Sequence, residues 1–178
     1  MKKTVLTFGL ISGALCSLNG GVAAFADKIG FDKSEILGYT ILVLSFLLVF
    51  FGIRSYRDNV GDGQITFTKA FTVGICITLI SSLCYVVTWE VLYFNFLPDF
   101  MDKYGAYMVE KLKASGASPA AIQAQLQQME KYKGLYLNAA MTFIEPFPVG
   151  LVITLISAAV LRKRAQSQPA QSPAPASY

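Results

Sequence analysis

The chain has 178 residues, of which 54% are hydrophobic and 15% are charged, and its formal net charge is +4. An ordinary soluble domain carries about a quarter charged residues, so this composition indicates an integral membrane protein. Basic residues stand singly, as the pair Lys2-Lys3 or as the run 162–164 at the ends of apolar runs, a pattern that is typical of membrane orientation and argues against a nucleic-acid-binding surface.

An enzymatic function is not expected. The chain has no histidine, which removes the usual imidazole base and the commonest nitrogen ligand of metal ions. Cys16, Cys76 and Cys84 all lie inside apolar runs, where a thiol usually serves as a small packing residue. The sequence also lacks a glycine-rich phosphate loop. We therefore predict no catalytic residues, no metal site and no cofactor.

The first apolar run covers residues 4–26 and follows a basic start. A signal peptide would combine these features with small residues before a cleavage site at Ala26. A first transmembrane helix would have the required twenty-odd residues, with Gly9 and Gly13 four residues apart on a face for close helix packing. We expect the retained helix, because three more spans follow it and need a packing partner.

Two further spans are predicted at residues 36–53 and 70–96. At about 1.5 Å per residue, the second of these runs outreaches a hydrocarbon core of roughly 30 Å. Its one charged residue is Glu90. Gly74 begins a series of small residues on this helix, which we assign to helix packing.

The connection between these two spans carries Arg54, Arg57 and Asp58 as candidate functional residues. The two arginines are three residues apart and therefore lie on one helical face. We expect them to contact lipid phosphate or Asp58 at the cytoplasmic interface. The sequence Gly61-Asp-Gly63 predicts a turn that returns the chain to the membrane.

A helical hairpin is predicted over residues 99–138. Apolar side chains recur there at helical spacing, Gly116 can end the first helix, and Ser118 with Pro119 can begin the second. Each apolar face is too narrow for an independent core, so we expect the two helices to pack on each other or on the outer membrane surface. Alternatively, the aromatic-rich face docks a protein partner or a second copy of the chain.

The last span is predicted over residues 142–161, which places Glu145 and Pro146 in the membrane helix or at its rim. The proline removes a backbone donor and should kink or restart the helix. Gly150 is assigned to helix packing. Residues 1–164 thus form one membrane domain, and residues 165–178, rich in Gln, Pro, Ala and Ser, are predicted to be a disordered tail.

The basic residues also predict the orientation. With four spans, the positive charges at residues 2–3, 54–69 and 162–164 fall on one side of the membrane. Positive residues favour the cytoplasmic side, so we expect both termini in the cytoplasm and the hairpin outside.

Four motifs carry a resemblance to a known family. They are Gly52-Ile-Arg-Ser-Tyr-Arg-Asp58, Gly63-Gln-Ile-Thr-Phe-Thr-Lys-Ala-Phe71, Tyr85-Val-Val-Thr-Trp-Glu90 and Phe143-Ile-Glu-Pro-Phe-Pro-Val-Gly-Leu151. In this order they resemble the uncharacterised bacterial inner-membrane family called domain of unknown function 4199, over nearly the whole chain except the tail. The resemblance implies a four-helix membrane domain with a soluble insertion before the last helix. It supplies no activity, substrate or site.

Glu90 and Glu145 are the candidate functional acids. Counted along their helices, they lie roughly 28 Å and 24 Å from the cytoplasmic boundary, at similar depths near the outer face. Each carboxylate can simply reach headgroups or water. Alternatively, the two face each other inside the bundle, where the pair would bind a cation or share a proton.

The sequence therefore predicts an all-α integral membrane protein, a four-helix bundle with an extramembrane helical hairpin between the third and fourth spans. We expect a non-enzymatic scaffold or accessory subunit of the bacterial inner membrane. Its partners would be membrane lipids and a protein partner or second copy held by the hairpin. The alternative is a small ion- or proton-coupled transporter component that uses Glu90 and Glu145.

Overall fold

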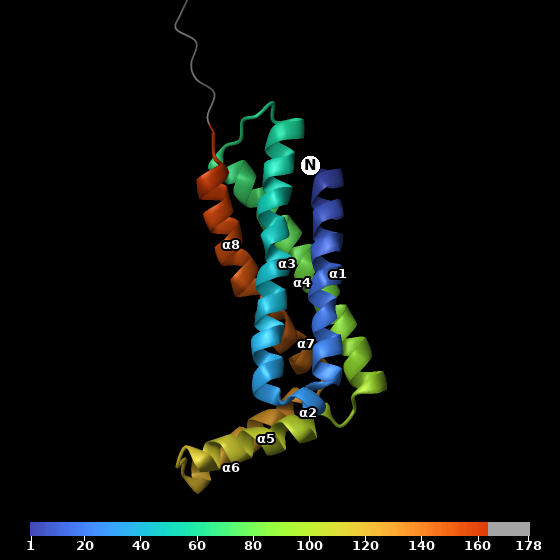
Figure 1. The fold of residues 1–178 in the computed structure, drawn as a ribbon, viewed down its shortest axis with the longest axis vertical. Coiled ribbons are helices and arrows are strands. Elements are labelled where there is room, and N and C mark those ends of the chain that lie inside the picture. The colour runs from blue at the N-terminus through green and yellow to red at the C-terminus, as the bar shows by residue number, and fades with distance from the viewer. Residues whose placement is uncertain (164–178) are drawn as a thin grey trace, which may run out of the picture.

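The computed structural model describes residues 1–163, and within them the chain is helical with one isolated β-bridge. The helices are α1 (Lys2–Ala24), α2 (Ala26–Ile29), α3 (Phe31–Val60), α4 (Phe67–Phe96), α5 (Phe100–Ala114), α6 (Pro119–Tyr132), α7 (Leu135–Ile144) and α8 (Pro146–Leu161). Figure 1 shows α1, α3, α4 and α8 running along one axis, with α5 and α6 lying across one end. The predicted tail falls outside the described residues.

Four helical segments are long and apolar enough to cross a membrane: α1, α3, α4, and α7 with α8 taken together. The central one is α4, which packs against α1, α3, α7 and α8. This arrangement confirms the predicted all-α fold class, with four membrane-span-like helices and further helices before the last of them.

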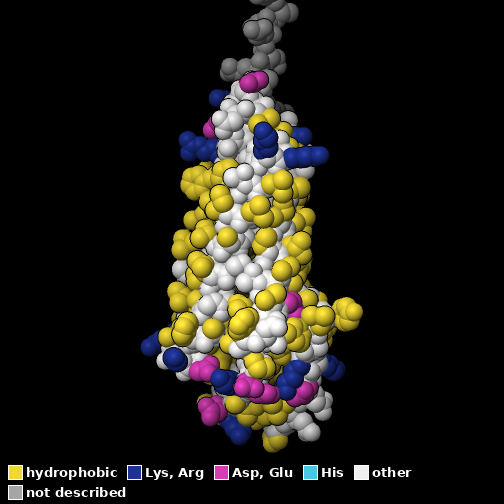
Figure 2. Space-filling view, turned by 90° about the vertical axis from the view of Figure 1, so that its right-hand side faces the viewer, with side chains coloured by type: hydrophobic (Ala, Val, Ile, Leu, Met, Phe, Trp, Pro, Cys, Tyr) yellow, Lys and Arg dark blue, Asp and Glu magenta, His cyan; other side chains and the backbone are white. Residues whose placement is uncertain are grey.

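The surface of the bundle is divided by chemistry. Figure 2 shows an apolar middle zone between two charged ends, with basic side chains near the end where α8 finishes and mixed charges at the opposite end. Large apolar side chains are exposed on each of the long helices, including Leu10, Leu44, Leu83 and Val160. Such a belt fits the hydrocarbon region of a bilayer, where exposed apolar side chains carry no penalty. We call the two ends the terminal end and the hairpin end.

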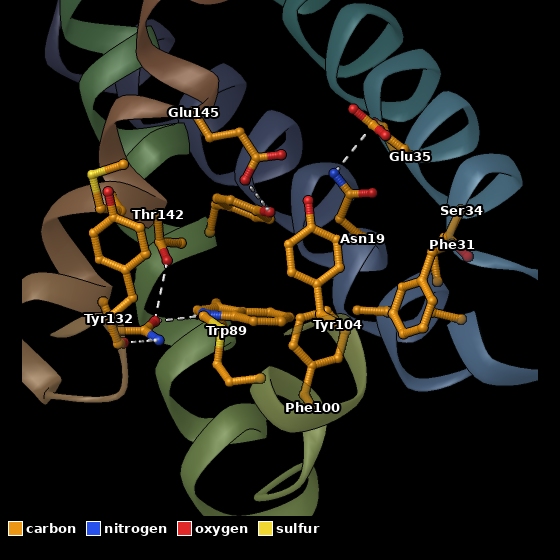
Figure 3. A pocket seen from close by; sticks show the side chains of 18 of the residues that line it. Asn19, Phe31, Ser34, Glu35, Trp89, Phe100, Tyr104, Tyr132, Thr142 and Glu145 are labelled. Carbon is orange, nitrogen blue, oxygen red and sulfur yellow. Dashed lines mark hydrogen bonds between the residues drawn. The ribbon is translucent and has the colours of Figure 1, made fainter. Parts of the chain in front are cut away.

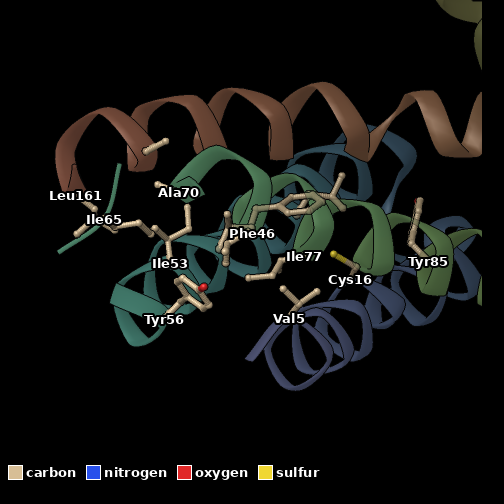
Figure 4. Close-up of a cluster of buried hydrophobic side chains, with 14 residues drawn as sticks. Val5, Cys16, Phe46, Ile53, Tyr56, Ile65, Ala70, Ile77, Tyr85 and Leu161 are labelled. Atoms are coloured by element: carbon tan, nitrogen blue, oxygen red, sulfur yellow. The ribbon is translucent and has the colours of Figure 1, made fainter. Parts of the chain in front are cut away.

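Close helix approach builds the core in the terminal half. A Cβ atom at Gly74 would lie 2.7 Å from the Thr154 methyl, and one at Gly150 would overlap the Thr78 methyl. The hydroxyls of Thr78 and Thr154 are 3.1 Å apart, so the polar groups at this contact pair with each other. Figure 4 shows Phe46, Ile53 and Ile77 filling the same region.

The first helix, α1, also approaches α4 closely at glycine residues. A Cβ atom at Gly9 would lie 2.9 Å from Ile80 Cβ, and one at Gly13 would lie 2.7 Å from Cys84 Cβ. The hydroxyl of Ser81 donates to the Gly9 carbonyl at 3.1 Å. Because lipid is as apolar as the helix surface, such close packing and interhelical hydrogen bonds hold membrane helices together.

The hairpin is formed as its sequence predicts. The first helix of the pair, α5, ends before Gly116, which has φ +76°, and the Ser118 hydroxyl accepts from the Ala121 amide at 3.3 Å to cap α6. The two helices pack on each other where a Cβ atom at Gly105 would lie 3.6 Å from the Met129 sulfur.

Two helices begin earlier than the sequence indicated. Residues 27–35 separate the first two predicted spans, but α2 covers part of them and α3 begins at Phe31 instead of near residue 36. The turn occurs at Gly30, whose φ of +90° suits glycine, and the Ser34 hydroxyl donates to the Gly30 carbonyl. The last membrane-span-like segment begins at Leu135, since α7 continues into α8 with a break at Pro146.

A matched pair of Gly→Ala substitutions tests the close contact between α4 and α8. At Gly150 the new methyl overlaps Thr78, so we expect Gly150→Ala to destabilise the bundle by about 1–3 kcal/mol. At Gly21 nothing lies within 4 Å of a new Cβ atom, so Gly21→Ala should leave stability unchanged or raise it slightly. Thermal unfolding in detergent, followed by circular dichroism, measures both; equal melting temperatures would contradict the contact.

Candidate functional site

A cavity of about 370 Å³ lies at the hairpin end of the bundle. Its walls come from seven helices, α1 to α7, and most of its lining is apolar or aromatic. Figure 3 shows its side chains converging from these helices. A space of this size is in the usual range for small-molecule sites, which lie around 300–1,000 Å³.

Aromatic rings form one wall of the cavity. The ring of Phe100 meets the Trp89 ring edge-on at 5.1 Å and stacks on Tyr104 at 6.1 Å, measured between centroids. The Phe31 ring continues the wall, 5.6 Å from that of Tyr104. We call Phe31, Trp89, Phe100 and Tyr104 the aromatic wall. Because α3, α4 and α5 each supply part of it, the wall also fixes α5 against the bundle.

A buried amide positions Trp89 within this wall. The indole nitrogen of Trp89 donates to Asn138 Oδ1 at 2.9 Å, and Asn138 Nδ2 donates to the Tyr132 carbonyl at 3.0 Å. The Asn138 side chain is 2% exposed, so these bonds replace water that cannot reach it. One side chain thereby links α4, α6 and α7.

Two carboxylates line the opposite side of the cavity. Glu145, at the break between α7 and α8, accepts a hydrogen bond from the Tyr85 hydroxyl at 3.1 Å. The side chain of Glu35, in the first turns of α3, makes no hydrogen bond or ion pair with the described residues. No lysine or arginine is among the residues that line the cavity, so neither carboxylate is neutralised by the cavity wall.

Ion pairs fasten α5 over the cavity from outside. Lys103 Nζ lies 2.6 Å from Asp27 Oδ2, and Lys111 Nζ lies 3.0 Å from Asp32 Oδ1, which also accepts from the Tyr107 hydroxyl. The hydrogen bond from Lys103 lowers the pKa of Asp27, and the same bond raises the pKa of Lys103. Both pairs are exposed, so their role is to orient α5 more than to stabilise the bundle.

The predicted acids do not occupy one site. Glu145 lines the cavity, whereas Glu90 is not among its lining residues. Successive helical residues are about 100° apart, so Glu90 points away from the direction of its neighbour Trp89. Both Glu90 carboxylate oxygens are covered and lack a hydrogen-bond partner among the described residues. The acid that shares the cavity with Glu145 is Glu35.

The predicted basic cluster lies at the terminal end, far along α3 from the cavity. Arg57 Nε donates to Asp58 Oδ1 at 2.7 Å, and Arg54 Nε lies 3.6 Å from Asp58 Oδ2. Both arginines therefore contact Asp58, one of the two contacts expected from the sequence. The packing glycines Gly9, Gly13, Gly74 and Gly150 also lie outside the cavity.

Sequence reasoning missed Glu35, Asn19 and Asn138 as site residues. Glu35 resembled an ordinary helix-start residue, although its place at the edge of an apolar span was a signal. Asn19 was a polar residue inside an apolar run; its side chain donates to the Gly38 carbonyl at 3.2 Å and joins α1 to α3 beside the cavity. Asn138 lies at the start of an apolar run but gave no periodic signal.

Replacing Asn138 tests whether its buried amide holds the Trp89 side chain in place. Asn138→Leu keeps the size of the side chain but leaves the Trp89 N–H and the Tyr132 carbonyl without partners, which should cost about 1–3 kcal/mol. Asn95→Leu is the matched control, because Asn95 is exposed and bonds only to the Val91 carbonyl. The readouts are thermal unfolding and the emission of Trp89, the chain's single tryptophan. A melting temperature unchanged by Asn138→Leu would disprove the role of this network.

The ion pair between Lys103 and Asp27 predicts a pH dependence in α5. A lowered carboxyl pKa stabilises the folded state above the ordinary value, and this contribution is lost as pH falls through the lowered value. At pH 7, Lys103→Gln should therefore speed hydrogen exchange of α5 relative to the native chain. The difference should shrink as the pH falls below about 4.

Lys113→Gln is the control for this experiment, since Lys113 is exposed on the same helix and makes no ion pair within residues 1–163. It should leave hydrogen exchange of α5 unchanged at both pH values. The assignment fails if the two variants behave alike at pH 7.

Comparison with known proteins gives one finding. A family model described as "Protein of unknown function (DUF4199)" matches residues 7–163, which include all the residues that line the cavity. No curated protein and no solved structure matches the chain. The match confirms the family that the ordered motifs indicated. The chain therefore belongs to the DUF4199 family of proteins of unknown function.

Proposed function

We propose that this chain is a non-enzymatic accessory protein of the bacterial inner membrane, which acts by holding a small amphipathic molecule in the cavity at its hairpin end. The observation that carries the proposal is the cavity itself, formed by seven helices and covered by α5. Its lining is mostly apolar, with a few polar groups, the composition expected for a small-molecule site.

The location of the cavity supports an amphipathic ligand. It lies at the edge of the apolar belt, where α3 begins and where the ion pairs of α5 start the charged end of the molecule. A ligand there would place an apolar part against the aromatic wall and a polar part beside the carboxylates. Aromatic residues are suited to such boundaries, since one edge of the ring is apolar and the other meets water.

The predicted orientation belongs to the same proposal. The terminal end carries basic residues at positions 2–3, 54–57 and 162–163, and positive residues favour the cytoplasmic side. Both termini would then be cytoplasmic, and the cavity and hairpin would lie on the outer side. The outward face of the hairpin stays the predicted contact surface for a protein partner.

A small ion- or proton-coupled transporter component is the second candidate. The position of Glu145 in a cavity supports it, because an ion could approach that carboxylate. Two observations favour the accessory protein instead. Glu90 does not line the cavity, and no lining residue comes from α8 or from the part of α4 that precedes Tyr85. The cavity is therefore confined to the hairpin half of the bundle and does not extend into the close-packed terminal half.

Filling the cavity tests the proposal. Ala23 lines the cavity on α1 and its neighbour Ala24 is exposed outside it, so Ala23→Phe and Ala24→Phe form a matched pair. We expect 2-phenylethanol and phenethylammonium, as amphipathic probes, to change Trp89 emission saturably in the native chain and in Ala24→Phe. Ala23→Phe should weaken this binding about tenfold or more, because a phenyl ring takes the place of the probe.

Thermal unfolding of both variants shows whether the fold is kept. Absence of saturable binding in the native chain, or equal binding in the two variants, would refute the proposed function.

A further inference from the structure

The ligand class can be narrowed further, on the basis of the proposed function. We propose that the cavity binds a small organic cation, whose ammonium group is held by Glu35 and Glu145 and whose apolar body rests against the aromatic wall. Figure 3 shows this arrangement: the labelled carboxylates of Glu145 and Glu35 lie on one side of the cavity, and the rings of Trp89, Phe100 and Tyr104 lie on the other.

The charges around the cavity favour a cation. Two carboxylates face one cavity, and none of the lysines or arginines among the described residues lines it. The nearby lysines Lys103 and Lys111 are engaged with Asp27 and Asp32 on the outer side of α5. Glu35 and Glu145 are both exposed, so a cation can reach their carboxylates, and at the edge of an apolar region a bound cation would neutralise both acids.

The aromatic wall also favours a cation. The faces of tryptophan, tyrosine and phenylalanine rings attract cations, and organic ammonium groups are commonly held by several such rings together. Here Trp89, Phe100 and Tyr104 form a continuous surface, with neighbouring ring centroids 5.1 Å and 6.1 Å apart. An anionic ligand would meet two carboxylates and the negative faces of these rings, so the same wall selects against it.

The side chains and the size of the cavity favour an organic cation over a metal ion. Within residues 1–163 no group of three or more His, Cys, Asp or Glu side chains is placed to hold a metal. The cavity is also large for a bare ion, at about 370 Å³, and mostly apolar in its lining. A cation with a hydrocarbon body fills that volume and buries the aromatic surface, which a hydrated ion does not.

Such an ammonium group could belong to a soluble amine or to a lipid headgroup. A shallow groove on the outer face of α3, lined by Ile36, Thr40 and Val43, shares Glu35 and Tyr39 with the cavity. This groove connects the acidic side of the cavity with the apolar belt. The shared chemistry is an ammonium group with an attached apolar body, and the two sources differ in whether lipid composition affects binding.

The experiment uses three probes of similar shape and different charge: phenethylammonium, 2-phenylethanol and 3-phenylpropionate. Each is titrated into the full chain in dodecyl maltoside at constant ionic strength, with calorimetry and Trp89 emission as readouts. We expect phenethylammonium to bind at least about tenfold more tightly than 2-phenylethanol, since charge-assisted hydrogen bonds add to the shared apolar contacts. The anion should bind most weakly.

Substitution of the acids tests their roles. Glu35→Gln and Glu145→Gln should each weaken phenethylammonium binding about tenfold while leaving 2-phenylethanol binding within about twofold of the native value. Retained binding of the alcohol also shows that each variant is folded. Glu110→Gln is the control, because Glu110 is exposed on α5 and does not line the cavity; it should bind all three probes as the native chain does.

Proteoliposomes identify the source of the ammonium group. The phosphatidylglycerol content is held fixed, and the remaining lipid is either phosphatidylethanolamine or a neutral glucolipid. Weaker phenethylammonium binding in phosphatidylethanolamine would identify a lipid headgroup as the occupant, and equal binding would identify a soluble amine. If phenethylammonium binds more tightly than 2-phenylethanol, either result supports a ligand with an ammonium group and an apolar body.

Two results would overturn this inference. One is equal affinity of the native chain for phenethylammonium and 2-phenylethanol; the other is unchanged phenethylammonium binding in both acid variants. In either case the proposed function survives, because it requires only saturable binding that Ala23→Phe blocks. Absence of binding for all three probes would refute both.

Discussion

The structure depends on the close approach of α1 and α8 to α4. In its terminal half, α4 presents Gly74, Thr78 and Ser81 to α8 and α1, and those helices bring their own glycines to the same contacts. Small side chains allow backbones to come together, and hydroxyls pair across the contact, which supplies the attraction that lipid does not. This half of the bundle is therefore filled by helix-to-helix contact.

The hairpin half of α4 has a different surface. Tyr85 and Trp89 replace the small residues there, and each is held by a polar group of the last membrane-span-like segment, Glu145 and Asn138 respectively. That segment is broken at Pro146, so α7 is free to depart from the line of α8. The cavity lies where large, anchored rings take the place of close contact, and α5 covers it through the aromatic wall and two ion pairs.

The candidate site was predicted only in part, and the reason is geometric. Counting residues along each helix gives depth, and it placed Glu90 and Glu145 at similar levels. Depth along the helix does not say toward which neighbouring helix a side chain points. That direction depends on the rotation of the helix about its own axis. One residue separates Glu90 from Trp89, and that single step turns its side chain about 100° away from the direction of Trp89. Glu35 reaches the cavity because α3 begins at Phe31, earlier than expected, where aromatic contacts with α5 stabilise its first turn.

The sequence by itself determined the elements whose causes are local. Long apolar runs predicted the membrane-span-like helices, Ser118 with Pro119 began α6, Gly116 followed the end of α5, and Pro146 divided α7 from α8. These signals act through hydropathy and backbone geometry within a few residues. Only the tertiary structure decided which side chains share the cavity. That outcome depends on the rotation of each helix about its axis and on the hairpin folding back across α3 and α4, contacts between residues far apart in the chain.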